Sequence, residues 1–173
     1  MATNQPAAHP AEAQPRGAEY LLFTCRQIPC AVALHELREV MRAVPHSVPL
    51  PFSPPWLLGV FSLRTELLGL VDPAPMLLGA GWAARDPAPP TATLIVGSPE
   101  PLLGLAVGAV GEITRIQPEQ IEPLHLPADS TGIPAYVSGR YHPAGAPHPY
   151  AVVDMAPFVA ALLRALEESS SHA

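Results

Sequence analysis

The chain has 173 residues, of which 49% are hydrophobic, and a formal net charge of −6. This length and apolar content predict a folded protein with a substantial core. Its nine basic residues are all arginine and are scattered along the sequence. They disfavour a nucleic-acid interface or an anionic membrane surface, because both need clustered positive charge.

Residues 1–18 are rich in Ala, Pro and polar side chains without periodicity, which predicts a disordered tail. They lack the basic start and apolar run of a signal peptide. No window approaches the roughly 18 consecutive apolar residues of a membrane helix. We therefore expect a cytoplasmic protein that does not insert into a membrane.

The first predicted element is a β-hairpin, because the β-favouring segments 20–25 and 30–34 flank a short polar connection. Cys25 and Cys30 within it are interpreted as small buried hydrophobic residues. Without neighbouring Cys or His they cannot complete a four-ligand zinc site, so no metal is expected.

Residues 35–42 place apolar side chains at helical spacing, which predicts a short helix. Prolines between residues 45 and 55 then keep the chain extended. A second hairpin is predicted where residues 56–63 and 67–71 flank Arg64 and Thr65. An arginine in such a turn either recognises a carboxylate through its fork of donors or is an ordinary solvated cation, and the pattern leaves both open.

The sequence repeats its own pattern. Without a gap, residues 93–118 overlay residues 20–45, and Gly59 and Asp72 find counterparts in Gly139 and Asp154. The five identical pairs in the ungapped stretch are Leu21/Leu94, Ala33/Ala106, Glu39/Glu112, Arg42/Arg115 and Pro45/Pro118. We expect a duplicated unit of strand, strand, short helix, strand, strand. Its short strands favour small closed barrels, because closure removes exposed edges.

Gly59, Asp72, Gly139 and Asp154 are assigned structural roles in turns. Each aspartate follows a valine and precedes a proline-bearing turn, where a carboxylate usually accepts hydrogen bonds from the next backbone amides. Residues 155–169 predict a C-terminal helix that packs on the barrels, with 169–173 frayed. We expect one domain over 19–168 that divides near 85–92, and leave open an exchange of elements between its halves.

A search for catalytic patterns finds no nucleophile elbow, no zinc-binding helix motif and no phosphate loop. The histidines fall in tails, proline-rich connections or the edge of a short segment, where loop positions facing solvent are the ordinary interpretation. We expect no catalytic residues, no cofactor and no enzymatic activity.

The ordered motifs resemble the CheW-like domain, the adaptor module of bacterial chemosensory arrays. The stretch from Gly59 to Thr65 is similar to the family's Gly-x-x-Asn-Leu-Arg-Gly block, and the following strand ends in Val71-Asp72. The later part is also similar, with a Gly104 strand and a Gly139 strand before Val153-Asp154. The resemblance covers about residues 19–166.

This resemblance implies a mainly β fold of two SH3-like five-stranded barrels with short helices and a C-terminal helix. It implies an adaptor that binds the cytoplasmic tip of chemoreceptors in a groove between the barrels. It also implies binding to the regulatory domain of a CheA-type histidine kinase through one barrel. Matched position by position, the receptor groove would be lined by Leu37, Glu39, Arg64, Gly104 and Val110, with Arg64 the key polar contact.

The chain departs from the family pattern at four positions, where Ser62, Thr65, Leu70 and Gly108 replace the usual Asn, Gly, Pro and Asp. We therefore expect a divergent member, and an accessory scaffold that keeps receptor binding but has a weakened kinase contact is an alternative. An SH3-like binding module of another pathway is a further alternative.

Overall fold

The computed structural model describes residues 17–78, 89–97, 101–124 and 136–170. The predicted tail lies outside these ranges apart from Gly17 and Ala18, and the first half of the predicted boundary at 85–92 also lies outside them. None of the helices within the described ranges has the length and the apolar run that a membrane crossing requires.

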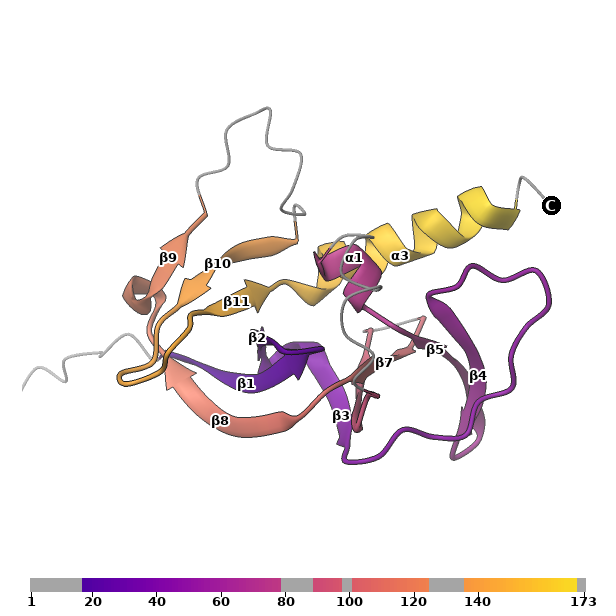
Figure 1. Cartoon of the computed structure of the whole chain (residues 1–173), viewed down its shortest axis with the longest axis horizontal. Helices are drawn as coiled ribbons and strands as arrows, with labels where there is room; N and C mark the ends of the chain where they lie inside the picture. Colours follow the sequence, from indigo (N-terminus) through magenta and orange to yellow (C-terminus); the bar gives the residue numbers. More distant parts are fainter. Residues whose placement is uncertain (1–16, 79–88, 98–100, 125–135, 171–173) are drawn as a thin grey trace, which may run out of the picture.

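Two antiparallel sheets with one parallel strand pair each make up the body of the molecule (Figure 1). The six-stranded sheet runs β8 (Val110–Ile116), β1 (Ala18–Cys25), β2 (Ile28–Ala33), β11 (Tyr150–Val153), β10 (Val137–Tyr141) and β9 (Ile121–Pro123). The five-stranded sheet runs β3 (Leu37–Met41), β6 (Ala92–Val96), β7 (Leu103–Val107), β5 (Glu66–Val71) and β4 (Leu57–Leu63).

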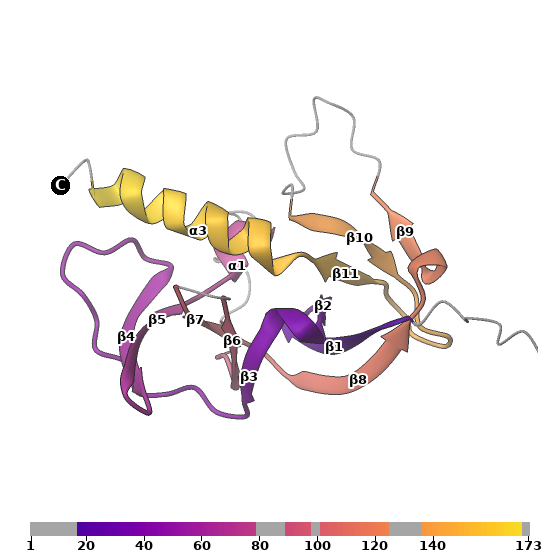
Figure 2. The same ribbon diagram turned by 180° about the vertical axis from the view of Figure 1, so that it is seen from behind.

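Within the described ranges, four helical segments connect or cover these sheets. Two are single 3₁₀ turns, η1 (Leu34–Glu36) and η2 (Pro118–Gln120), and one is the short helix α1 (Ala74–Leu78). The C-terminal helix α3 (Met155–Ser170) leaves the six-stranded sheet, passes α1 and ends on the side of the β4–β5 hairpin (Figures 1 and 2). Ser169, predicted to be frayed, belongs to this helix and donates its hydroxyl to the carbonyl of Ala165 at 2.8 Å.

The two repeats of the sequence exchange strands. Strands β1 and β2 of the first repeat join β8 to β11 of the second, whereas β6 and β7 of the second join β3 to β5 of the first. The exchange occurs because β3 pairs with β6 and β8 pairs with β1. A boundary near residues 85–92 therefore separates the two repeats in the sequence but not the two sheets.

The prediction of a helix over residues 35–42 is wrong, because η1 leads directly into β3. The pairing of β3 with β6 shifts its register between Leu37 and Glu39. This bulge resets the alternation of the strand. Leu37 and Val40 consequently both pack against the main core, and their spacing of three residues imitates a helix.

The core has three parts. The largest lies between the sheets and is closed by α1 and α3; it includes Phe23, Leu94, Leu105 and Phe158. Each sheet also has its own smaller core, around Leu22 and Tyr141 in one and around Phe61 and Leu70 in the other. Strands β6 and β7 are buried along their whole length, because one face of each contributes to the main core and the other to the core around Phe61.

Candidate functional site

The strand exchange places β3 at the junction of the two subdomains. The chain leaves β2 of the six-stranded sheet, turns through η1 and enters the five-stranded sheet at Leu37, which pairs with Val96. Leu37 is half-buried against the main core, and Glu39 lies two residues further along. Figure 2 shows β3 on the side of the five-stranded sheet that is nearest to β1 and β8.

Arg64 is tied to β3 through Glu39. It is the first residue of the two-residue turn between Leu63 and Glu66, and its φ is 57°, a conformation that favours glycine. Its Nη2 lies 3.1 Å from Oε2 of Glu39, with side-chain exposures of 74% for Arg64 and 33% for Glu39. An ion pair this exposed contributes about 0–1 kcal/mol to stability. The contact thus serves to orient the guanidinium at the edge of β3.

A second ion pair reinforces the same connection. Nη2 of Arg38 lies 3.5 Å from Oε2 of Glu66, and both side chains are exposed. Together the two pairs hold the β4–β5 turn against β3 across the open edge of the five-stranded sheet. The structure therefore brings together Leu37, Glu39 and Arg64 from the predicted groove.

The other two predicted groove residues contribute to the core, although Gly104 is in register with Glu39 across β6. Gly104 is buried in β7, and a β-carbon at this position would lie 2.8 Å from Cε1 of Phe61, inside the core of the five-stranded subdomain. Val110 begins β8 and packs against the main core opposite Phe23. It borders a small hollow with Arg42, at the other end of β3.

An apolar groove with a cavity volume of about 460 Å³ opens beside the start of β3. We call it the α3 groove. It is lined by His35, Glu36, Gly97, Pro101 and five residues of α3: Met155, Ala156, Val159, Ala160 and Leu163. Sequence reasoning missed it, since its walls come from η1, the β6–β7 connection and α3, and no local pattern shows that these segments meet.

Glu36 fixes the start of α3 in this groove. Its Oε1 accepts hydrogen bonds from the backbone amides of Met155, at 3.0 Å, and Ala156, at 3.4 Å. Such acceptors satisfy amides that the first turn of a helix leaves unpaired. Burial raises the pKa of the Glu36 carboxyl, an effect that the two amides oppose and the nearby Asp154 carboxylate strengthens.

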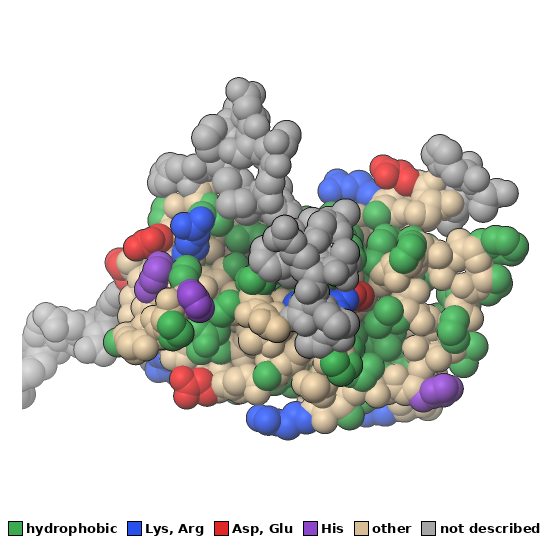
Figure 3. Space-filling model, viewed as in Figure 1, with side chains coloured by type: hydrophobic (Ala, Val, Ile, Leu, Met, Phe, Trp, Pro, Cys, Tyr) green, Lys and Arg blue, Asp and Glu red, His purple; other side chains and the backbone are tan. Residues whose placement is uncertain are grey.

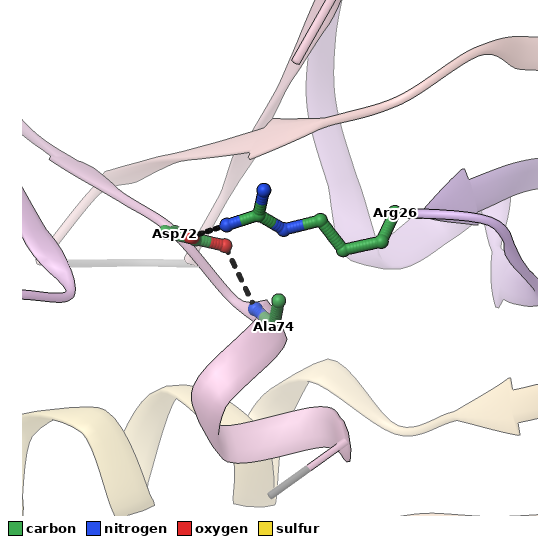
Figure 4. Close-up of polar contacts among 3 residues, drawn as sticks. All are labelled: Arg26, Asp72 and Ala74. Atoms are coloured by element: carbon green, nitrogen blue, oxygen red, sulfur yellow. Dashed lines mark hydrogen bonds and ion pairs between the residues drawn. The ribbon is translucent and has the colours of Figure 1, made fainter. Parts of the chain in front are cut away.

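The two aspartates assigned to turns differ in their contacts. Asp72 behaves as predicted, since its Oδ1 accepts a hydrogen bond from the amide of Ala74 at 3.0 Å (Figure 4). Asp154 instead accepts from the hydroxyl of Ser138 at 3.0 Å. The backbone amides of Met155 and Ala156, which follow Asp154, donate to Glu36. The prediction that Asp154 accepts these hydrogen bonds is therefore wrong.

Asp72 also joins the two sheets, which the sequence did not indicate. Its Oδ2 lies 2.5 Å from Nη2 of Arg26, in the β1–β2 turn, and the side chains are 18% and 20% exposed (Figure 4). The pair borders a cavity of about 340 Å³ whose lining includes Thr24 and Gly108. Because most of both side chains is shielded from water, this pair is better suited than the exposed pairs to hold the subdomains together.

Gly59 and Gly139, the two glycines assigned structural roles, occupy matching irregularities. Each lies where the register of its hairpin shifts, in β4–β5 and β10–β11. A β-carbon at Gly59, whose φ is 140°, would lie 2.4 Å from the carbonyl oxygen of Val48. One at Gly139 would lie 2.5 Å from Cγ2 of Ile121. Both positions therefore require glycine for close approach of a neighbouring segment.

Cys25 and Cys30 are free thiols buried in the main core. Burial raises the pKa of the Cys30 thiol to about 12 and raises that of Cys25 as well. Protonated, buried thiols are poor nucleophiles and poor metal ligands. Within the described ranges, no group of three or more His, Cys, Asp or Glu side chains could hold a metal ion.

A second surface feature lies at the far end of the five-stranded sheet. Val48, Leu50 and Phe52, in the proline-rich loop before β4, are 60%, 40% and 95% exposed. Figure 3 shows apolar side chains grouped at this end of the molecule. The hydroxyl of Ser53 donates to the carbonyl of Leu50 at 2.8 Å, and Val48 pairs with Val60, so these bonds flank Phe52 on both sides of the loop.

Comparisons with known proteins agree with this architecture. The family model of the CheW-like domain matches residues 19–160. The chemotaxis protein CheW of Rhizobium meliloti (strain 1021) is 28% identical over 107 residues; the match covers 62% of this chain and 66% of that relative, slightly under two thirds of its length.

A solved structure is also similar. The scaffolding protein TtCheW from Thermoanaerobacter tengcongensis matches with a TM-score of 0.65 and 21% identity, over 80% of this chain and 89% of its own. At this identity the likeness concerns the fold alone. The predicted fold of two SH3-like subdomains with a C-terminal helix is confirmed, and one sheet carries the additional three-residue strand β9.

Proposed function

Because the chain belongs to the CheW-like domain family, we propose that it is a non-enzymatic adaptor of a bacterial chemosensory complex. It would couple the cytoplasmic tips of chemoreceptors to the regulatory domain of a CheA-type histidine kinase. The observation that carries this proposal is the family match over residues 19–160, which includes the segments that meet at β3.

The receptor tip would dock along β3 and into the neighbouring α3 groove. Leu37 and the groove provide apolar surface, and Arg64 stands at the edge, oriented by Glu39. A helix binds such a surface by laying one apolar face into the groove. A single oriented cation can then fix its register on a carboxylate.

An adaptor needs a second surface that stays free when the first is occupied. The loop with Phe52 meets this requirement, because it is exposed and lies at the end of the five-stranded sheet. Exposed aromatic side chains are typical anchors of protein interfaces. The kinase regulatory domain would bind there, although Ser62, Thr65, Leu70 and Gly108 also fit an accessory member that binds the kinase weakly.

Calorimetric titration with a receptor-tip fragment and with the kinase regulatory domain, each from the same organism, tests the proposal. Arg64→Glu should weaken receptor binding at least tenfold while the circular dichroism spectrum is unchanged, since it places a carboxylate beside Glu39. Arg140→Glu, an equal charge reversal on the exposed face of β10, is the control. Phe52→Ala should weaken only kinase binding. Failure of the wild-type chain to bind any receptor tip contradicts the proposal.

A further inference from the structure

The α3 groove has apolar walls and one carboxyl side chain set into them. Seven of its nine lining residues are Gly, Pro, Met, Ala, Val or Leu, and the remaining two are His35 and Glu36. His35 is exposed, whereas Glu36 is half-buried. A partner seated in the groove would therefore cover the Glu36 carboxylate and replace the water around it.

Glu36 has no strong counter-charge in the described part of the molecule. It forms no ion pair there, and the start of α3 supplies only about half a positive charge. Asp154 shares that helix terminus, and its carboxylate is close enough to raise the pKa of Glu36. Two carboxylates thus face about half a unit of positive charge, so the local balance is negative, and His35 is the nearest group that could offset it.

The groove also has a definite direction. Glu36 lies at the first turn of α3, and the exposed or half-exposed residues Ala156, Ala160 and Leu163 continue along one face of the helix. At a rise of 1.5 Å per residue these span about 10 Å, or two helical turns. A partner helix would meet the carboxylate at one end of this face and apolar surface along the rest.

We propose that the α3 groove binds an amphipathic helix of the partner whose apolar stripe ends in one Lys or Arg, and that this cation pairs with Glu36. The inference rests on the proposed function, because it specifies the chemistry of the helix that the adaptor accepts. It adds a second polar contact, opposite in sign to Arg64. A helix bearing a carboxylate at the same position would be rejected by like charges.

The carboxylate is maintained at a cost to stability, which a purely structural cap would not need. Because burial raises its pKa, ionisation of Glu36 is less favourable in the folded state than in the unfolded chain. A glutamine at this position would still offer an oxygen to the amides of Met155 and Ala156. Charge at Glu36 is thus not required for the cap, but it is required for pairing with a cation.

The test titrates the receptor-tip fragment into the wild-type chain, Glu36→Gln and Glu36→Lys. Glu36→Gln should keep or raise the unfolding midpoint yet weaken binding about tenfold, and Glu36→Lys should weaken it further. The loss should shrink in high salt, because the lost interaction is ionic. Glu119→Gln, which removes the same charge from exposed η2, should change nothing.

Each Lys and Arg of the fragment is then replaced by Gln in turn. One of these replacements should weaken binding to the wild-type chain but cause no further loss of affinity for Glu36→Gln. Equal affinity of wild type and Glu36→Gln overturns the inference but leaves the proposed function standing, whereas absence of any wild-type binding removes the proposed function itself. If Glu36→Gln instead changes only self-association in light scattering, the groove holds a second copy of this chain and the inference is wrong.

Discussion

Gly104 offers a direct test of where the functional surface ends and the core begins. Family resemblance predicts that it lines the receptor groove, but the structure places it inside the five-stranded subdomain. In Gly104→Ala the added β-carbon would lie 2.8 and 2.9 Å from Cε1 and Cζ of Phe61 and 3.1 Å from Cγ2 of Thr93. Carbon atoms prefer separations of about 3.5–4.0 Å, so both neighbours must move.

Overpacking of this kind costs about 1–3 kcal/mol. Part of it is offset, because alanine restricts the unfolded chain by about 0.4–1 kcal/mol and the backbone of Gly104 is not in the left-handed region. We expect a net loss of about 1–2 kcal/mol. For a chain of this length that corresponds to about 2–8 °C in Tm, while affinity for the receptor tip stays within twofold.

Thermal and urea unfolding followed by circular dichroism measure the loss. Gly69→Ala in the adjacent β5 is the matched control, because its β-carbon would come no closer than 3.4 Å to a neighbour, and it should cost less than about 0.5 kcal/mol. Phe61→Leu removes the ring that the new β-carbon would touch. The loss of unfolding free energy caused by Gly104→Ala should therefore be smaller by at least about 0.5 kcal/mol in the Phe61→Leu background than in the wild type. If Gly104→Ala had wild-type stability but bound the receptor tip more weakly, the placement of Gly104 in the core would be refuted.

Three further predictions concern charges and thiols. Asp72→Asn should lower the free energy of unfolding by about 1–2 kcal/mol, because it breaks the shielded pair with Arg26, whereas Glu66→Gln should change it by less than about 0.5 kcal/mol in the same urea titration. The thiols should react with a disulfide reagent at pH 8 only after denaturation, because burial raises the pKa of Cys30 to about 12; rapid labelling of the native chain would contradict this. Glu36→Gln should be at least as stable as wild type at pH 7, and urea midpoints should converge as the pH falls below the ordinary carboxyl value of 4.5, since a raised pKa favours folding only where the proton is bound. A gap that widens in acid would refute it.

Local patterns predicted the hairpins correctly. Both predicted hairpins are present, and both turns have two residues. Arg26 and Arg64 each adopt a φ of 57°. The predicted connection 26–29 was too long, because Ile28 and Pro29 belong to β2. Strand composition is a property of a few consecutive residues, so the sequence was sufficient to place the hairpins but not the first turn.

Contacts between distant segments were outside the reach of the same reasoning. The bulge in β3 depends on its pairing with β6, more than 50 residues away, and it disguised a strand as a helix. The cap of Glu36 on Met155 crosses 119 residues. The α3 groove depends on that cap, so no local pattern could reveal it. Leu37, Glu39 and Arg64 were proposed from the family resemblance, and the contact of Arg64 with Glu39 is visible only in the structure.

The duplication gives the α3 groove a counterpart, the cavity bordered by Arg26 and Asp72, but the two differ in the residue that precedes the following strand. Glu36 precedes β3, and 73 residues later the equivalent position before β8 is Ala109, which has no side-chain acceptor. The helix of the first repeat, α1, is capped by its own Asp72, whereas α3 is capped by Glu36 of the other repeat. The two sites of the pseudo-symmetric pair are therefore unequal, because the α3 groove has a carboxylate where its counterpart has Ala109. Binding at this groove depends on both repeats, because its cap comes from the first and its wall from the second.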